Sequence, residues 1–166
     1  MLNYRSLTAA DDAALASIIR TSLEQMHLNL PGTAYFDPEL DHLSAYYAQK
    51  PKKRTYFVAL DDAGQVAGGV GVAEFAPIPN CAEIQKLYLS DAVRGKGCSK
   101  ELMRLAETWA KEAGYQQLYL ETHSNLQIAI KLYEKLGFTQ IERPKEVLHS
   151  TMDHFYNQAS VTACDR

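Results

Sequence analysis

A basic, glycine-containing turn joins an apolar run to an amphipathic segment in the second half of the chain. The stretch is LYLSDAVRGKGCSKELM, residues 87–103, and the turn is Arg94-Gly95-Lys96-Gly97. Backbone N–H groups in the first turn of a helix lack partners within the helix and carry a partial positive charge. Glycine lets an anion approach such groups closely. The pattern therefore predicts a strand, an anion-binding turn and a helix. A tight turn with two exposed basic side chains is the alternative.

Three kinds of phosphate-binding loop compete for this turn. A Walker A loop requires G-x-x-x-x-G-K-[ST], and the sequence contains no such stretch. The dinucleotide fingerprint G-x-G-x-x-G matches at Gly95 and Gly97, but Lys100 stands where the third glycine would permit close packing of helix on strand. Glu121 does lie at about the spacing of a ribose-binding acid, so this kind stays open. The third kind is a coenzyme A loop of the form Arg/Gln-x-x-Gly-x-Gly/Ala.

Hydrophobic periodicity and turn residues predict the order β, α, α, β, β, β, α, β, α, β, β, which is a mixed α/β fold. Strands are expected at 2–7, 55–60, 65–75, 81–89, 115–123, 138–143 and near 147–156. Helices are expected after a capping box at Thr8 and Asp11, and at 38–50, 97–114 and 124–137, the last capped by Ser124 or Asn125. Glycines 68, 69 and 71 predict a bulge or a close backbone approach in the second hairpin strand.

Length and composition favour one soluble domain. The chain has 166 residues, and we expect a domain at 1–156 followed by a flexible tail at 157–166. A net charge of −3 argues against nucleic acid or an anionic membrane as partner. The three cysteines, Cys81, Cys98 and Cys164, are odd in number and lack metal-ligand spacing, so we expect neither a disulfide framework nor a metal. A reducing cytoplasm fits this cysteine usage. The apolar runs are shorter than the ~20 residues that span a bilayer, and the start does not read as a signal peptide.

Two segments together resemble the GCN5-related N-acetyltransferase (GNAT) family. The stretch at 87–103 resembles the strand, pyrophosphate loop and helix of that family. THSNLQIAIKLYEKLGF, residues 122–138, resembles its second signature, and AEI at 82–84 fits the opening of its central strand. The resemblance covers most of 55–156 closely and the first residues loosely. It implies a GNAT-like mixed central sheet of about six or seven strands with about four helices, and acyl-CoA bound at a splay between the fourth and fifth strands.

The resemblance also implies acetyl-CoA as co-substrate and assigns residues to it. Asn125 would bind the coenzyme through its side-chain amide, a plain helix N-cap being the alternative. Ser99 replaces the family's last Gly or Ala, but its N–H is unchanged, so we expect binding to survive, slightly weakened. The pyrophosphate would be held by backbone N–H groups of Gly95, Lys96, Gly97, Cys98, Ser99 and Lys100, with Arg94 opening the turn. The pantetheine arm would pair like an added strand with the backbone of Leu87, Tyr88 and Leu89.

The resemblance places Tyr133 near the coenzyme sulfur, where it would donate a proton to the leaving thiolate. The alternative is core packing, because Tyr133 lies on an apolar helical stripe. A primary amine with a pKa of about 10.4 is almost all charged at neutral pH, so a general base helps. Glu83 is the candidate, because at about 3.3 Å per strand residue it lies near the expected thioester. A solvated strand residue is the alternative for Glu83, and His123 and Glu121 are rival bases.

The acceptor site is expected in the irregular segment 27–43, beside the glycine-rich strand and the loop 76–80. Tyr35, Phe36, Asp37 and Asp41 could bind an amine there, and ordinary surface-loop residues are the alternative.

The most specific hypothesis for the function is an N-acetyltransferase that moves an acetyl group from acetyl-CoA to a primary amine of a small molecule or peptide by direct attack. A non-catalytic acyl-CoA-binding sensor is the alternative. A nucleotide-cofactor oxidoreductase comes third, motivated by Gly95, Gly97 and Glu121. The sequence does not name the acceptor amine, and the resemblance leaves room for a homodimer.

Overall fold

Seven strands form one mixed sheet in the computed structural model, which describes residues 1–147 and 149–159. The strand order across the sheet is β1-β2-β3-β4-β5-β7-β6. The strands are β1 (Asn3–Ser6), β2 (Thr55–Leu60), β3 (Val66–Glu74), β4 (Cys81–Leu89), β5 (Gln117–Thr122), β6 (Thr139–Ile141) and β7 (His154–Gln158). Neighbouring strands pair antiparallel except β4 and β5, which are parallel and are joined by a helical crossover.

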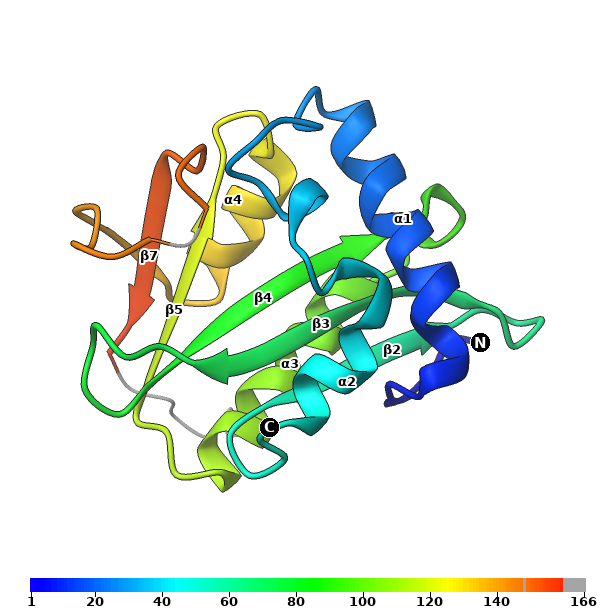
Figure 1. Cartoon of the computed structure of the whole chain (residues 1–166), viewed down its shortest axis with the longest axis horizontal. Coiled ribbons are helices and arrows are strands. Elements are labelled where there is room, and N and C mark those ends of the chain that lie inside the picture. Colours follow the sequence, from blue (N-terminus) through cyan, green and yellow to red (C-terminus); the bar gives the residue numbers. More distant parts are fainter. Residues whose placement is uncertain (148, 160–166) are drawn as a thin grey trace.

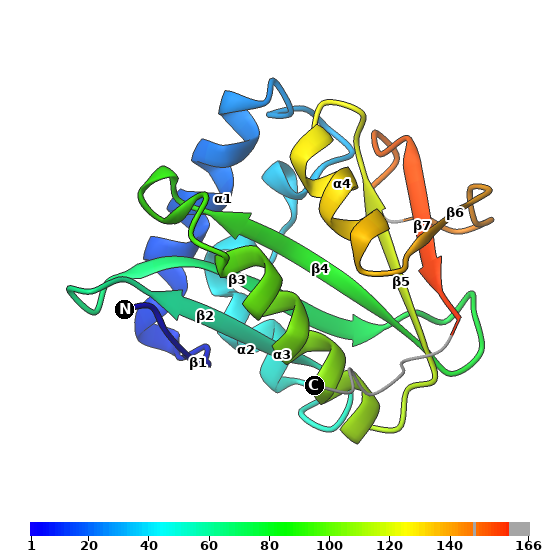
Figure 2. The same ribbon diagram turned by 180° about the vertical axis from the view of Figure 1, so that it is seen from behind.

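Helices cover both faces of this sheet. They are α1 (Asp12–Gln25), α2 (Leu43–Ala48), α3 (Cys98–Glu112) and α4 (Gln127–Lys135). The first two cover the face toward the viewer in Figure 1, and α3 and α4 cover the opposite face, seen in Figure 2. Each face carries its own apolar layer: Leu102 and Ala106 of α3 pack with Ile84 on one face, while Leu15 and Ile19 of α1 pack with Val58 on the other.

The expected order of strands and helices is confirmed, with shifts where local signals are weak. The expected capping box is present: the Asp11 carboxylate accepts hydrogen bonds from the backbone N–H and the hydroxyl of Thr8. The helix expected at 38–50 opens as a 3-10 turn, Leu40–His42, before α2. The last strand, expected near 147–156, begins only at His154, so the described residues just before it, 149–153, form a loop.

The start of α4 and the end of β7 also differ from the expected positions. The helix expected at 124–137 begins at Gln127, and its N-cap, Leu126, makes no side-chain cap. Ser124 and Asn125 therefore do not cap it, because Ser124 bonds Asp153 and the Asn125 amide bonds the Met26 carbonyl. Strand β7 continues to Gln158, two residues past the expected domain boundary at 156. The expected flexibility of the tail concerns mainly residues 160–166, which lie outside the described part of the chain.

A bulge in β4 changes which face its side chains reach. Gly71 pairs with Gln85 and Gly69 with Tyr88, so two residues of β4 lie opposite one residue of β3. Lys86, one of the two, has a φ of 49°. Such a bulge redirects side chains without ending the strand. Its consequence here is that Gln85 and Lys86 both make their side-chain contacts on the α1/α2 face.

The glycines of β3 make room for aromatic rings that reach this bulge. A Cβ on Gly69 would lie 2.3 Å from the ring of Tyr56. The Tyr56 hydroxyl crosses above Gly69 and donates a hydrogen bond of 2.8 Å to the Lys86 carbonyl, which the bulge has removed from the ladder. The predicted close approach at these glycines is confirmed, whereas the bulge opposite them has its extra residue in the neighbouring strand, β4. The hydrogen bond from Tyr56 gives the Lys86 carbonyl a partner, and this avoids the free-energy cost of an unpaired buried carbonyl.

Strands β4 and β5 separate soon after they meet. Their ladder is limited to the first three residues of each strand, and its last pair is Glu83 with Tyr119. Beyond that pair the two strands diverge as a V (Figure 1). The edge of β4 that faces the opening is therefore free of strand pairing from Ile84 onward. An unpaired strand edge is a template for an extended ligand that carries amides.

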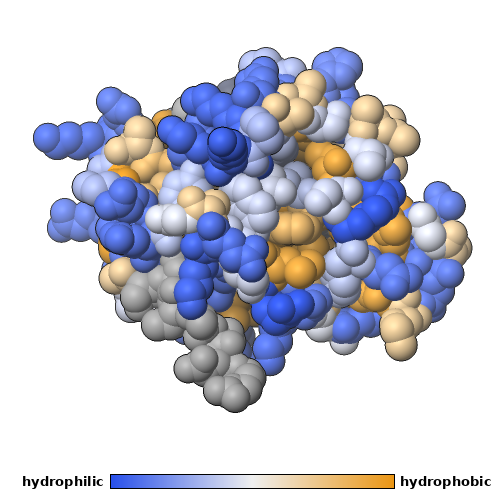
Figure 3. Space-filling model, turned by 90° about the horizontal axis from the view of Figure 1, so that it is seen from below, coloured by the Kyte–Doolittle hydropathy of each residue, from blue (hydrophilic) through white to orange (hydrophobic). Residues whose placement is uncertain are grey.

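The surface gives no sign of an extended apolar face on the side drawn in Figure 3. Hydrophilic side chains cover most of that side, and hydrophobic ones form small separate patches (Figure 3). Within the described ranges, no helix is both long and apolar enough to cross a bilayer.

Candidate active site

The glycine turn forms an open loop at the N-terminus of α3. Gly95 and Gly97 have φ angles of 76° and 75°, a region that favours glycine. Within 1–147 and 149–159, the backbone N–H groups of Gly95, Lys96 and Gly97 have no hydrogen-bond partner. A Cβ added to either glycine would meet no atom within 4 Å. Arg94 folds back to pair with Asp91 at 3.2 Å. The loop thus presents free N–H groups to open space, as an anion site requires.

An orphaned hydroxyl lies at the end of β5, next to the opening between the strands. Thr122 is 2% exposed, and its Oγ1 atom has no partner among the described residues. Alternate residues Leu118 and Leu120 belong to the apolar layer that contains Tyr133, so Thr122 faces the α3/α4 side. Free N–H groups, an unpaired strand edge and a buried hydroxyl together fit a ligand with a pyrophosphate and an amide-bearing arm. The residues present therefore fit coenzyme A.

Tyr133 of α4 faces the same side. Its side chain is 7% exposed and its ring lies edge-on to Phe138, 6.1 Å between centroids. Its hydroxyl has no hydrogen-bond partner among the described residues. Burial raises the pKa of Tyr133 well above its usual range, so the phenol is protonated at neutral pH. The ring of Tyr133 packs in the apolar core, as the core-packing alternative predicts, and its protonated hydroxyl is unpaired. The role of Tyr133 as proton donor stays a prediction.

Glu83 is buried on the opposite, α1/α2 face, where β4 and β5 part. It is 5% exposed, so its interpretation as a solvated strand residue is wrong. Burial raises its pKa to about 7, and the nearby Glu121 carboxylate acts in the same direction. The Gln85 amide opposes them by donating a hydrogen bond of 2.7 Å to Oε1 of Glu83. A carboxyl with this pKa is partly ionised at neutral pH, which suits a general base.

A hydrogen-bonded chain holds Glu83 from the side of α2. The Tyr47 hydroxyl donates to Oε1 of Gln85 at 2.8 Å, and this fixes the orientation in which the Gln85 amide meets Glu83. Tyr47 reaches this position across Gly71, where a Cβ would lie 2.2 Å from the Tyr47 oxygen. The glycines of β3 therefore leave room both for Tyr56 at the bulge and for Tyr47, which orients Gln85 beside the candidate base.

The two rival bases have different surroundings. Glu121 follows Tyr119, the ladder partner of Glu83, by two residues, so the two carboxyl groups share one face. The Glu121 side chain is 5% exposed and accepts a 2.9 Å hydrogen bond from the Tyr119 hydroxyl. His123 lies in the loop after β5, where its Nδ1 accepts from the Asn125 N–H and its Nε2 is 3.7 Å from Asp153. Glu121 is therefore the rival that shares surroundings with Glu83.

Lys86 and His149 were missed by sequence reasoning and complete a chain of charges on this face. Lys86 Nζ lies 2.7 Å from Oδ2 of Asp37 and 3.7 Å from Glu39. His149 Nε2 lies 2.9 Å from Oδ1 of Asp37, and its Nδ1 lies 3.3 Å from Oε1 of Glu121. The sequence signals for these two residues were weak: Lys86 is a basic residue after the glycine-rich hairpin, and His149 is a histidine in a segment expected to be a strand.

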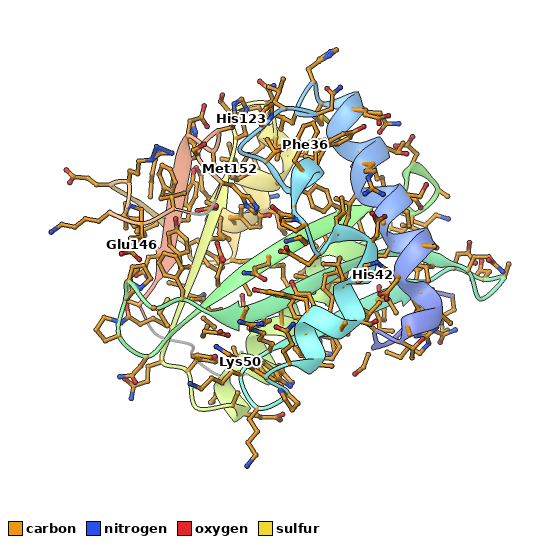
Figure 4. All side chains as sticks on the ribbon, viewed as in Figure 1. Phe36, His42, Lys50, His123, Glu146 and Met152 are labelled. Atoms are coloured by element: carbon orange, nitrogen blue, oxygen red, sulfur yellow. The ribbon has the colours of Figure 1, made fainter. Side chains whose placement is uncertain are left out.

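The predicted acceptor residues separate in the structure. Asp37 enters the chain of charges, and although burial opposes its charged form, His149 and Lys86 lower its pKa. Tyr35 instead donates a 2.7 Å hydrogen bond to Glu24 of α1. Phe36 is 60% exposed, and Figure 4 places it at the end of the molecule toward which β5 runs. Asp41 makes an exposed, two-pronged pair with Arg20. Only Asp37 of these four reaches the surroundings of Glu83.

Asn125 does not act as a helix cap, so that alternative is wrong. Its side-chain amide donates a 3.0 Å hydrogen bond to the Met26 carbonyl, which ties the end of α1 to the loop before α4. The predicted contact of Asn125 with the coenzyme stays a prediction. Across residues 1–147 and 149–159, no group of three or more His, Cys, Asp or Glu side chains is arranged to hold a metal ion.

Comparisons with known proteins agree with this geometry. The sequence model of the Acetyltransferase (GNAT) family matches residues 21–138. The uncharacterized N-acetyltransferase YjgM of Escherichia coli K12 is 39% identical over 140 residues, covering 83% of this chain and 82% of the relative.

Solved structures share the fold. An acetyltransferase of the GNAT family from Staphylococcus aureus Mu50 superposes with a TM-score of 0.83 at 16% identity, over 95% of this chain and 98% of that one. The PaiA N-acetyltransferase of Thermoplasma acidophilum, solved in complex with coenzyme A, gives 0.75 at 18% identity, over 96% and 99%. The chain belongs to the GNAT family of acetyltransferases, and it is an acetyl-CoA-dependent N-acetyltransferase.

Proposed function

We propose that this chain acetylates a primary amine of a small molecule or peptide by direct attack of the amine, with Glu83 as base and Tyr133 as acid. The observation that carries the proposal is the position of the buried Glu83 carboxyl at the point where β4 and β5 part, and burial raises the pKa of this carboxyl to about 7. A buried phenol with an unpaired hydroxyl lies on the other face of the same sheet. Acetyl-CoA supplies an activated acetyl group as its thioester.

Each residue then has a separate task. Glu83 accepts a proton from the acceptor ammonium, directly or through water, and leaves a neutral amine that can attack. The amine nitrogen forms its bond to the acetyl carbon as the bond from carbon to sulfur breaks, and the Tyr133 hydroxyl gives its proton to the departing sulfur. The second proton that the nitrogen loses as it becomes an amide restores the Tyr133 phenol through water, and the proton on Glu83 passes to solvent. The Tyr47–Gln85 chain keeps the Glu83 carboxyl in place. The free N–H groups of the loop from Gly95 would hold the pyrophosphate.

Two features support one bound orientation. The loop N–H groups lie at the end of the open β4 edge, beyond Leu89, and Glu83 lies near its beginning. The backbone from Glu83 to Leu89 spans about 20 Å at 3.3 Å per residue, so an extended arm anchored at the loop can place its far end near Glu83. Leu87, Tyr88 and Leu89 would then pair with the arm.

Thermal unfolding with acetyl-CoA tests the binding half of this proposal. Ligand at about 100 times its dissociation constant stabilises by about 2.7 kcal/mol, which raises the midpoint by roughly 5–10 °C at this chain length. NAD serves as the control ligand, since the dinucleotide alternative predicts the opposite preference.

A pair of glycine variants locates the binding. Gly97→Ala and Gly64→Ala place a methyl group at φ angles of 75° and 77°, each with no atom within 4 Å. Both should lose similar stability through backbone strain, about 1–2 kcal/mol. Only Gly97→Ala should also lose the shift with acetyl-CoA. Equal shifts in both variants would place the coenzyme elsewhere.

Turnover tests the catalytic half. Release of free thiol from acetyl-CoA is followed over a panel of monoamines, diamines, amino acids and short peptides. Thiol release that depends on one class of amine supports the proposal and names the acceptor class. Tight acetyl-CoA binding without thiol release from any amine of the panel would contradict the proposed acceptor class.

A further inference from the structure

The loop before β7 is tied to the loop between α1 and α2. The Thr151 N–H donates to the Gly32 carbonyl at 3.0 Å, and the Thr151 hydroxyl donates to the Pro31 carbonyl at 2.6 Å. His149 adds a charged contact to Asp37 in the same region. Residues more than 110 positions apart in the sequence are therefore joined across one side of the sheet.

His149 also joins these two loops to the sheet itself. Its Nδ1 atom lies 3.3 Å from the carboxylate of Glu121 in β5. Asp37, the other partner of His149, forms a 2.7 Å ion pair with Lys86 of β4. The sequence of contacts Lys86, Asp37, His149, Glu121 thus starts on one strand of the V and ends on the other. It crosses the α1/α2 face beyond the last ladder pair, where Glu83 lies.

We propose that His149 is a positioning residue for acetyl transfer: by bridging Asp37 and Glu121 it fixes the Glu121 carboxylate beside Glu83 and governs how readily Glu83 accepts the proton of the amine. This inference rests on the proposed function, because it assigns no task to His149 unless Glu83 is the base. His149 itself does not touch the reacting atoms.

The physical reason is the spacing of two carboxyl groups on one sheet face. Glu121 alone would disfavour ionisation of Glu83, because like charges repel strongly where water is excluded. The His149 cation in contact with Glu121 offsets part of that repulsion. His149 and Lys86 act in this direction on Glu83, opposing burial and Glu121. His149 therefore tunes the base through its neighbour.

The charge state of His149 fits this task. Burial opposes its charged form, but the hydrogen bonds to Asp37 and Glu121 outweigh burial and raise its pKa to about 9. It is therefore cationic at neutral pH. Other titratable groups also face Glu83. One of them is Cys81 of β4, which stays a neutral thiol because burial raises its pKa. The remaining ones are Lys86, Glu121, Tyr119 and Tyr47. Asp37 contacts His149 and Lys86.

The test is the pH dependence of kcat/KM in three variants. Removing the cation with His149→Gln should move the acid limb of the profile to higher pH by about one unit. Removing the like charge with Glu121→Gln should move the same limb to lower pH. His154→Gln is the matched control, since His154 also pairs with a carboxylate, Asp153 at 2.7 Å, but lies on β7 and is not among the groups that face Glu83.

Opposite shifts in the first two variants and none in the control are the expected result. A merely structural role for His149 predicts a lower rate with an unmoved acid limb, and that outcome overturns the inference. Loss of the limb in Glu121→Gln would make Glu121 the base and also overturn it. Thermal midpoints and acetyl-CoA shifts of each variant show whether it is folded and loaded.

Failure of the proposed function itself has a different signature. If Glu83→Gln keeps the wild-type acid limb, then Glu83 is not the base, whatever His149 does. If Glu83→Gln loses the limb while His149→Gln leaves it in place, the proposed base stands and only the positioning role of His149 falls.

Discussion

Replacing Glu83 by glutamine removes one ionisable oxygen and keeps the size of the side chain. The amide that replaces the carboxyl retains a carbonyl oxygen that can accept the 2.7 Å hydrogen bond from Gln85, so the chain from Tyr47 can persist. The Glu83 side chain makes no ion pair closer than 4 Å with another described residue. Folding should therefore survive, and the change should act on proton transfer.

The magnitude follows from the pKa of the buried carboxyl and that of the amine. With a pKa of about 7, half of Glu83 is ionised at neutral pH. An alkyl amine with a pKa of about 10.4 has only roughly one neutral molecule in 2,500 at pH 7. A positioned base contributes about 10²–10⁴ in rate, so kcat/KM should fall about 10³-fold at pH 7.

The loss should shrink as pH rises, because solvent then deprotonates the amine without help. The neutral fraction of the amine grows about 100-fold between pH 7 and pH 9. The deficit of Glu83→Gln should accordingly fall from about 10³ to about tenfold over this range. Wild-type kcat/KM should instead rise to a plateau just above pH 7.

The assay is initial-rate thiol release at subsaturating amine, at half-unit steps from pH 6 to 9.5, with acetyl-CoA binding checked at each pH by thermal shift. A loss of equal size at every pH would mean that Glu83 acts in structure or binding and not as a base. Unchanged activity at pH 7 would refute the reasoning outright.

Further predictions concern the acid, the glycine-rich strand and pH. Tyr133→Phe should lower kcat about 100-fold or more in thiol release while leaving the thermal midpoint nearly unchanged, because its hydroxyl has no described partner; full turnover at all pH values would exclude the acid role. Gly71→Ala forces a methyl group against Tyr47 and should cost about 1–3 kcal/mol of unfolding free energy in denaturant titrations, together with a lower kcat/KM; an unchanged midpoint would contradict the close contact. Because folding raises the pKa of His149 to about 9, its contribution to stability is complete below about pH 6.5 and is lost as pH rises through 9. Urea titrations should therefore show a loss of about 2–3 kcal/mol by pH 10 that is absent in His149→Gln.

Much of the fold could be predicted from local patterns. The amphipathic stripe with Leu102 and Ala106 places α3, and it needs no knowledge of the rest of the chain. The loop from Gly95 to Gly97 was found because left-handed φ angles favour glycine and a helix start exposes N–H groups. Boundaries were less accurate at α4, since Ser124 and Asn125 look like caps but are engaged by distant partners.

The sequence by itself determined the order of elements, the glycine turn before α3 and the family, because each depends on residues that are neighbours along the chain. Only the tertiary structure decided that Glu83 is buried, since its exposure depends on what covers one face of the sheet. The same is true of the bulge at Lys86, which depends on the register between β3 and β4. It is most true of His149, whose partners Asp37 and Glu121 lie 112 and 28 positions away. Contacts of that range arise from how loops fold back over a sheet, and no local periodicity encodes them.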